Sequence, residues 1–415
     1  MKKLEKYSFG VGDRFTRQGR AQLAALLEAK KLGVDIVPVW NKSFREHSII
    51  HTQPDSVRAE ADAAVKALGW KNGYYVDADH IGLKNVDLFI SASDFFTLDV
   101  ADFSGKPADQ GSVADFIAAH RRYIGKLRVE GIDHPLDITE GVIESAARKY
   151  LLAVQEAGKI YRHVEAKKGK GNFITEVSID ETDAPQSPVE MLFILSAVAR
   201  EGIPAQTVAP KFTGRFNKGV DYVGDLVQFE KEFNEDLAII AFAVREFGLP
   251  GNLKLSVHSG SDKFSIYPAI RKAIKKRDAG LHLKTAGTTW LEELIGLACA
   301  GGEGLVIAKE VYRKAHGRYD ELCGPYASVI DIDKTRLPSP DEVDLWDEKK
   351  YSETLRHVQS NRNYNLHVRQ LLHVGYKVAA EMGDRYYRAL EDHEEVIAHN
   401  VTENLFDRHI KRVFV

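Results

Sequence analysis

The sequence is poor in cysteine and contains no long apolar run. Its 415 residues include two cysteines, Cys299 and Cys323, too few for a disulfide scaffold or a cysteine-ligated zinc site. A reducing cytoplasm is therefore the expected compartment. No stretch approaches the roughly 18 to 20 apolar residues of a membrane-spanning helix, and the first residues lack the apolar core of a secretory signal. We expect a globular protein that is neither secreted nor inserted in a membrane.

The chain also lacks an excess of charge of either sign. Its formal net charge is -3, with 44% hydrophobic and 28% charged residues, which is an ordinary composition for a folded protein. The absence of a basic field argues against a nucleic-acid binder held by phosphate contacts. A chain of this length is either one large α/β domain of the barrel type or two ordinary domains.

Short β-rich runs alternate with amphipathic helical patterns along most of the chain. Seven such runs occur, at residues 7–13, 35–41, 73–80, 172–178, 205–211, 253–258 and 280–285. This repeat is typical of parallel βαβ units, and an eighth strand would close a (β/α)8 barrel of the TIM type. Residues 327–332 and residues 370–374 are the two candidates for that strand. An open doubly wound sheet would need a glycine-rich phosphate motif after the first strand, and residues 9–14 supply only two of its glycines.

Two segments fall outside the repeat. Residues 85–170, between the third and fourth of these runs, contain an extra strand pair and then mostly helix, which predicts an inserted cap over the barrel mouth. The chain from about 338 to 415 is helical and charged, which predicts an extension packed on the outside of the barrel. We therefore predict a single barrel domain over residues 1–415, of the α/β class, with this cap and this extension.

Ionisable residues gather where the predicted strands end. The carboxyl ends of barrel strands share one mouth, so these side chains are expected to lie together. An inward-facing charged group costs desolvation unless it is paired or bound to a metal. The residues concerned are Arg14, Asp77, Asp79, His80, Glu176, Lys211, His258, His282 and Lys284.

Three of these residues are histidines that predict a metal site. A single strand histidine is more often a hydrogen-bonded core residue than a ligand. His258 and His282 on neighbouring strands, with His80 across the mouth and a carboxylate nearby, instead suit a divalent ion such as Zn²⁺, Mn²⁺ or Ni²⁺. His373 lies among apolar residues, and we expect it in the core.

The carboxylates have two interpretations each. Glu176, in the middle of a β-branched run, is either a catalytic acid or base or the partner of a structural salt bridge to Lys211 or Lys284. Asp77 and Asp79 either take part in catalysis or cap the helix that follows. The sequence alone leaves both alternatives open.

Six segments together resemble the tagaturonate epimerase family, and the likeness runs from about residue 7 to 385. Their order and combination are fairly specific. The segments are FGVGDRF at 9–15, YVDADHI at 75–81, SVHSGSDK at 256–263, HLKTAGT at 282–288, ELCGPY at 321–326 and RQLLHVGY at 369–376.

The resemblance implies a cytoplasmic, divalent-metal-dependent enzyme of hexuronate catabolism. Such an enzyme interconverts D-tagaturonate and D-fructuronate by inversion at C4, and some relatives act on the neutral ketohexoses tagatose and fructose. Laid on this sequence, the family pattern implies a base at Asp79 beside His80, with His80 on the metal. It further implies an acid at Glu176 and metal ligands at His258 and His282.

The reaction fits this set of side chains. C4 is β to the C2 ketone, so its hydrogen is not acidic enough for simple enolisation. A retro-aldol route breaks and re-forms the C3–C4 bond, whereas transient oxidation would need a nicotinamide, for which the sequence has no convincing binding motif. Asp79 and Glu176 on opposite sides of the C4 hydroxyl suit the retro-aldol route. The substrate carboxylate needs a cation, for which Arg14, Lys211 and Lys284 are candidates.

Other functions use the same side chains. A lysine Schiff base at Lys211 or Lys284 would be the competing aldolase-type chemistry. A metal-dependent aldolase of class II type or a sugar isomerase is the first alternative to the epimerase. A sugar-acid binding protein without turnover is the second. In each case the expected partner is a small sugar acid.

Overall fold

Eight parallel strands close into a barrel in the computed structural model, which describes residues 1–180, 182, 184–285 and 287–415. Each strand pairs with its two neighbours, and β10 pairs with β1 to close the ring. The predicted (β/α)8 class is confirmed. The strands are β1 (Tyr7–Gly12), β2 (Val37–Ser43), β3 (Tyr75–Ile81), β4 (Phe95–Asp99), β7 (Ile174–Ser178), β8 (Thr207–Ala209), β9 (Lys254–His258) and β10 (Leu281–Lys284).

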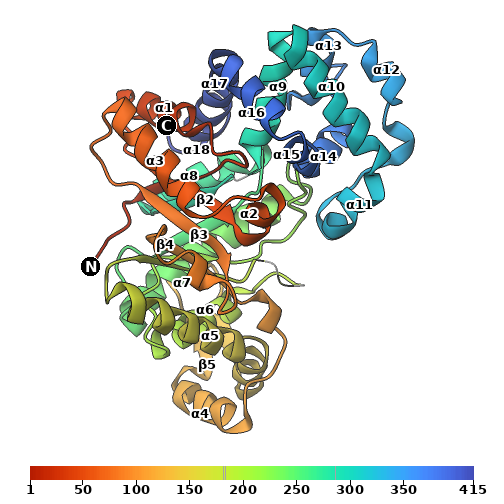
Figure 1. Cartoon of the computed structure of the whole chain (residues 1–415). Coiled ribbons are helices and arrows are strands. Elements are labelled where there is room, and N and C mark those ends of the chain that lie inside the picture. The colour runs from red at the N-terminus through yellow and green to blue at the C-terminus, as the bar shows by residue number, and fades with distance from the viewer. Residues whose placement is uncertain (181, 183, 286) are drawn as a thin grey trace.

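Helices surround the barrel (Figure 1). Two of them, α2 and α6, begin at capping boxes in which Ser43 pairs with Glu46 and Ser187 with Glu190, so their starting points are encoded locally. The helices up to the last strand are α1 (Gly19–Lys31), α2 (Phe44–Ile50), α3 (Asp55–Leu68), α4 (Gln110–His120), α5 (Glu140–Lys168), α6 (Pro188–Arg200), α7 (Leu226–Phe247) and α8 (Tyr267–Arg277).

The strand that the sequence left ambiguous is β4, and it lies inside the segment predicted as an insertion. Phe95–Asp99 pairs with β3 on one side and β7 on the other. Neither candidate for the eighth strand was right, because residues 324–329 form a 3-10 helix and residues 370–374 belong to α14. The run FFTL is short and buried on both faces, so it lacks the alternation that marks a half-exposed strand.

The extra segment therefore lies one strand later, between β4 and α5. It carries α4 and a small hairpin of β5 (Gly125–Leu127) and β6 (Leu136–Ile138). His120 lies 2.6 Å from the Ser196 hydroxyl on α6, and Tyr123 donates to Glu246 on α7 over 2.6 Å. These contacts place the segment against the outer helices α6 and α7, and not over the carboxyl ends of the strands, where the predicted cap would lie.

The chain after β10 is helical to its end. In Figure 1 the helices α10 to α14 form a lobe at the upper right, and the C-terminus returns beside α1. Phe414 packs on Tyr7 of β1 at 5.2 Å between ring centroids, so the end of the chain lies against the first strand. The elements are α9 (Thr288–Ala300), α10 (Gly302–Gly317), α11 (Tyr319–Cys323), α12 (Pro340–Asp344), α13 (Glu348–Leu355), α14 (Leu366–Val374), α15 (Tyr376–Glu381), α16 (Asp384–Asp392), α17 (Glu394–Glu403), the π-helix Asn404–Ile410 and α18 (Lys411–Val413).

The inside of the barrel changes from apolar to polar along its axis. Toward the amino ends of the strands, Val39, Tyr75, Phe95 and Ile174 form a closed apolar cluster. Toward the carboxyl ends the inward positions carry ionisable groups instead. The carboxyl ends of the strands are therefore where an active site is expected.

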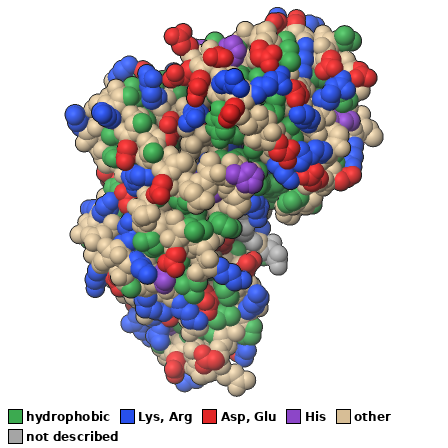
Figure 2. Space-filling model, in the orientation of Figure 1, with side chains coloured by type: hydrophobic (Ala, Val, Ile, Leu, Met, Phe, Trp, Pro, Cys, Tyr) green, Lys and Arg blue, Asp and Glu red, His purple; other side chains and the backbone are tan. Residues whose placement is uncertain are grey.

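The surface is mixed in charge. On the face shown in Figure 2, acidic and basic side chains are interspersed without an extended patch of one sign. Among the described residues, no helix combines the length and the apolar character needed to cross a membrane.

Candidate active site at the carboxyl ends of the strands

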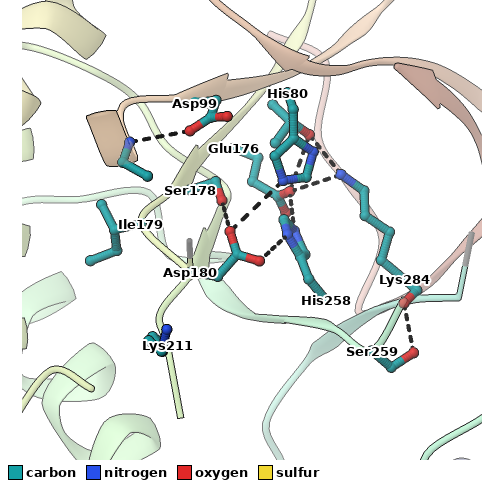
Figure 3. A network of polar contacts seen from close by, with 12 residues as sticks. His80, Asp99, Glu176, Ser178, Ile179, Asp180, Lys211, His258, Ser259 and Lys284 are labelled. Atoms are coloured by element: carbon teal, nitrogen blue, oxygen red, sulfur yellow. Dashed lines mark hydrogen bonds and ion pairs between the residues drawn. The ribbon is translucent and has the colours of Figure 1, made fainter. Parts of the chain in front are cut away.

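Lys284 of β10 lies at the centre of a buried ion cluster inside the barrel (Figure 3). Its Nζ is 2.8 Å from Asp77 and 2.7 Å from Asp79, both on β3, and 3.3 Å from Glu176 on β7. The Thr97 hydroxyl on β4 accepts a further hydrogen bond from Nζ over 2.9 Å. Residues on three other strands thus hold one ammonium group in place.

The cluster fixes the charge of its members. Burial alone would lower the pKa of Lys284, but Asp77, Asp79 and Glu176 together raise it well above its usual value. Burial raises the pKa of Asp77 to about 6, against the opposing effect of Lys284, whereas Lys284 and His80 outweigh burial and lower that of Asp79. Since imine formation needs a neutral amine, these contacts argue against a Schiff base at Lys284.

We expect Lys284→Met to destabilise the protein by about 3–5 kcal/mol, because it leaves three buried carboxylates without their cation. Denaturant unfolding measures this loss. Lys211→Met is the matched control, since the Lys211 ammonium donates to the carbonyl of Thr182 and is not fully buried. Equal, small losses in both variants would contradict the central role of Lys284.

Beside this cluster, two histidines and an aspartate face one another (Figure 3). His258 of β9 has Nδ1 at 3.1 Å from Asp180 and Nε2 at 2.8 Å from Glu176. His80 of β3 has Nδ1 at 2.8 Å from Asp79 and Nε2 at 3.8 Å from Asp180. One ligand atom from each of His80, Asp180 and His258 lies within 4.8 Å of the others, a spacing at which the three side chains could hold a metal ion.

The electrostatics of this triad suit a cation. Burial would lower the pKa of His258, but Asp180 and Glu176 raise it to about 9. Asp79 and Asp180 likewise raise the pKa of His80 well above its usual range, against the effect of burial. Burial would raise the pKa of Asp180, but His258 and His80 lower it well below its usual range. The carboxylates thus favour positive charge at this point, which a proton or a metal ion can supply.

His80 reaches the triad through an unusual backbone conformation. Successive strand residues point to opposite faces, so Asp79 and His80 would normally diverge. His80 has a positive φ of 54°, and the pairing of β3 with β4 shifts register between Ala78 and Ile81. This irregularity lets the two neighbours contact each other at the mouth. A left-handed residue other than glycine costs roughly 1–2 kcal/mol, which is typical of strain kept at a functional site.

The family of the chain follows from its similarity to known proteins. A family model described as tagaturonate epimerase matches residues 1–413. The chain belongs to the tagaturonate epimerase family. It is accordingly a carbohydrate epimerase, an enzyme of the isomerase class.

Individual relatives agree with this family. The tagaturonate/fructuronate epimerase of Thermotoga maritima is 30% identical over 422 residues, which cover 98% of this chain and 79% of the relative. A fructuronate-tagaturonate epimerase structure from Cohnella laeviribosi matches with a TM-score of 0.81 at 22% identity, over 100% of this chain and 82% of that one. A probable tagatose 6-phosphate kinase from Sinorhizobium meliloti shares the fold, with a TM-score of 0.51 at 10% identity over 98% of this chain and 100% of that one.

Within this family member, six of the residues selected from the sequence do come together, since Lys284 joins Asp77 and the four residues named next. Asp79, His80, Glu176 and His258 form one connected network. The salt bridge between Glu176 and Lys284, considered as a structural role, is present as well. Since Glu176 also contacts His258, its structural and chemical roles coexist at one carboxylate.

His282 lies apart from the metal-ligand group. It is two residues before Lys284 on β10, fully buried, with Nδ1 at 2.9 Å from the Ser8 hydroxyl and its ring 5.4 Å from Phe95. In the group of donors that could hold a metal ion, the third residue is Asp180 and not His282. Asp180 lies two residues beyond Ser178, the last residue of β7, so its position in the sequence is only a weak signal for its place beside Glu176.

The predicted cations differ in their surroundings. Arg14 follows β1, is paired with Glu46 and lies over the Tyr376 ring at 4.9 Å. Lys211 donates to the carbonyl of Thr182, so it has no ion pair with Glu176. His373 is 3% exposed and lies against Gly287, in agreement with a buried position.

Proposed function

We propose that this enzyme interconverts D-tagaturonate and D-fructuronate by inverting C4, with a divalent metal ion held by His80, Asp180 and His258. The main support for this proposal is the spacing of these three donors at the barrel mouth, beside the ion cluster of Lys284. The second support is that the chain belongs to the tagaturonate epimerase family. Two imidazoles and a carboxylate suit Zn²⁺, Mn²⁺ or Ni²⁺. When bound, such an ion would supply a Lewis acid for the oxygens of the ketose.

The residues around the triad would orient its ligands. Glu176 contacts His258 at Nε2 and Asp79 contacts His80 at Nδ1, so each imidazole is held by a carboxylate at one nitrogen. This arrangement leaves Nδ1 of His258 and Nε2 of His80 facing Asp180. Carboxylates behind metal-ligating histidines fix the ring orientation and raise ligand basicity.

We assign inversion to a retro-aldol route in which Asp79 and Glu176 exchange the proton. Asp79 takes the proton from the C4 hydroxyl as the C3–C4 bond breaks, giving an aldehyde at C4 and an enediolate on the remaining fragment. After the aldehyde rotates, the bond re-forms on its other face and the new hydroxyl regains a proton. Lys284 contacts both Asp79 and Glu176, so its ammonium can relay the proton between them.

The carboxylate of the substrate needs a cation at the mouth. Of the three candidates, Lys284 is held within its ion cluster and Lys211 bonds a backbone carbonyl. Arg14 follows the carboxyl end of β1 and is itself paired with Glu46, but its planar guanidinium carries five N–H donors and matches a carboxylate best. We therefore assign the carboxylate to Arg14. We further place the enzyme in the cytoplasm, where the free thiols of Cys299 and Cys323 remain reduced.

Metal removal tests the proposal. After exhaustive treatment with EDTA, conversion of tagaturonate to fructuronate should fall to background and return on adding Zn²⁺, Mn²⁺ or Ni²⁺. Product NMR in D₂O adds the route, because retro-aldol cleavage leaves the hydrogen on C4 in place. Full activity of metal-free enzyme would refute the metal, and deuterium at C4 would refute the route. Release of a three-carbon fragment would favour the aldolase alternative.

A further inference from the structure

The Asn41 side chain is a buried amide at the barrel mouth that the ion cluster and the metal triad do not use. Asn41 is 1% exposed, yet neither Nδ2 nor Oδ1 has a hydrogen-bond partner within the part of the chain that the structure describes. A buried amide without partners costs roughly 1–3 kcal/mol, so folded proteins rarely keep one without a reason.

The register places this amide inside the mouth. Val37 and Val39 of β2 belong to the apolar cluster within the barrel, while Trp40 bonds Gln22 of the outer helix α1. Strand alternation therefore turns Asn41 inward. Asn41 pairs with Gly12 of β1 on one side and with Asp77 of the ion cluster on the other.

Gly10 on β1 leaves space for the Asn41 amide. A side-chain carbon at Gly10 would lie 3.0 Å from Nδ2 of Asn41 and 2.7 Å from Cγ of Lys284. The Asn41 amide therefore lies beside the Gly10 backbone, close to the aliphatic part of the Lys284 side chain.

We infer that Asn41 binds the substrate, with its NH₂ group donating to one oxygen of the sugar-acid chain and its carbonyl accepting from a neighbouring hydroxyl. The inference rests on the proposed function, which supplies a ligand rich in adjacent hydroxyls. A primary amide offers one donor face and one acceptor face, and two adjacent oxygens of a ketohexuronate match that pair. The substrate then provides the partners that the protein does not.

Asn41→Leu tests the inference, because leucine has a similar size and no polar atoms. We expect kcat/KM for tagaturonate to fall at least about tenfold, since the substrate oxygens would face an apolar group. The melting temperature of the substrate-free variant should stay or rise, and its metal content should not change. The rise in melting temperature that saturating tagaturonate gives the wild type should shrink in the variant.

Thr207→Val is the matched control. The Thr207 hydroxyl on β8 is also fully buried and without a partner among the described residues, but it belongs to neither the triad nor the ion cluster. We expect its kcat/KM to stay within about twofold of the wild type. Asn41→Ala serves as a second variant if the leucine does not fold.

The outcomes separate cleanly. An Asn41→Leu enzyme with kcat/KM within about twofold of the wild type would overturn the inference, as would an equal loss in Thr207→Val. Loss of metal or of folding in both Asn41 variants would make the amide structural and overturn it as well. A wild-type enzyme without turnover would refute the proposed function itself, before any variant is compared.

Discussion

His258→Ala should leave the enzyme with well below one equivalent of bound metal and no measurable turnover. The imidazole is one of three donors in the triad and contacts both other parts of the site, Asp180 through Nδ1 and Glu176 through Nε2. Removing one of so few ligands leaves two, which seldom hold a divalent ion. Elemental analysis after dialysis against a metal-containing buffer, followed by an initial-rate assay, measures both quantities.

His282→Ala is the control that the barrel itself provides. His282 is also a fully buried histidine on a neighbouring strand, but its Nδ1 bonds Ser8. We expect this variant to keep about one equivalent of metal and to lose stability through the cavity and the lost hydrogen bond. Metal lost in both variants would restore His282 to the ligand set that the sequence indicated, whereas metal retained in His258→Ala would contradict the triad.

The sequence was sufficient to predict the barrel because most strands carry a local signal. Seven β-rich runs precede amphipathic helices, and that repeat has few solutions. Phe95–Asp99 was misplaced because a short strand buried on both faces looks like any apolar run, and because forty residues separate it from α5. Because the extra segment separates β4 from α5, the sequence did not show that these two elements form one βα unit.

The site was predictable where strand alternation holds and was missed where it fails. Strand alternation correctly placed Lys284 among the polar residues of the mouth. It also placed His282 there, although His282 lies two residues nearer the amino end of β10. It gives no reason for Asp79 and His80 to meet, which depends on a positive φ that the sequence does not reveal. Asp180 lies beyond the end of β7, where the strand pattern no longer applies.

Glu176→Gln should lower kcat by about 10²- to 10⁴-fold while the protein stays folded. The glutamine amide keeps the shape of the side chain and can still accept hydrogen bonds from Lys284 and His258, but it cannot exchange a proton. Stability should fall only modestly, because Asp77 and Asp79 remain at 2.8 Å and 2.7 Å from the Lys284 ammonium. Thermal unfolding, metal content and initial rate are measured on one preparation.

Thr97→Val separates proton exchange from packing in the same cluster. The Thr97 hydroxyl lies 2.9 Å from Lys284 and 3.1 Å from Glu176, so valine removes hydrogen bonds of the cluster without removing an ionisable group. This variant should lose stability with a much smaller change in kcat than Glu176→Gln. If Glu176→Gln instead loses its metal, Glu176 acts by orienting His258. If it loses stability while each folded molecule keeps a near-normal rate, the carboxylate is a structural partner of Lys284 and has no part in proton transfer.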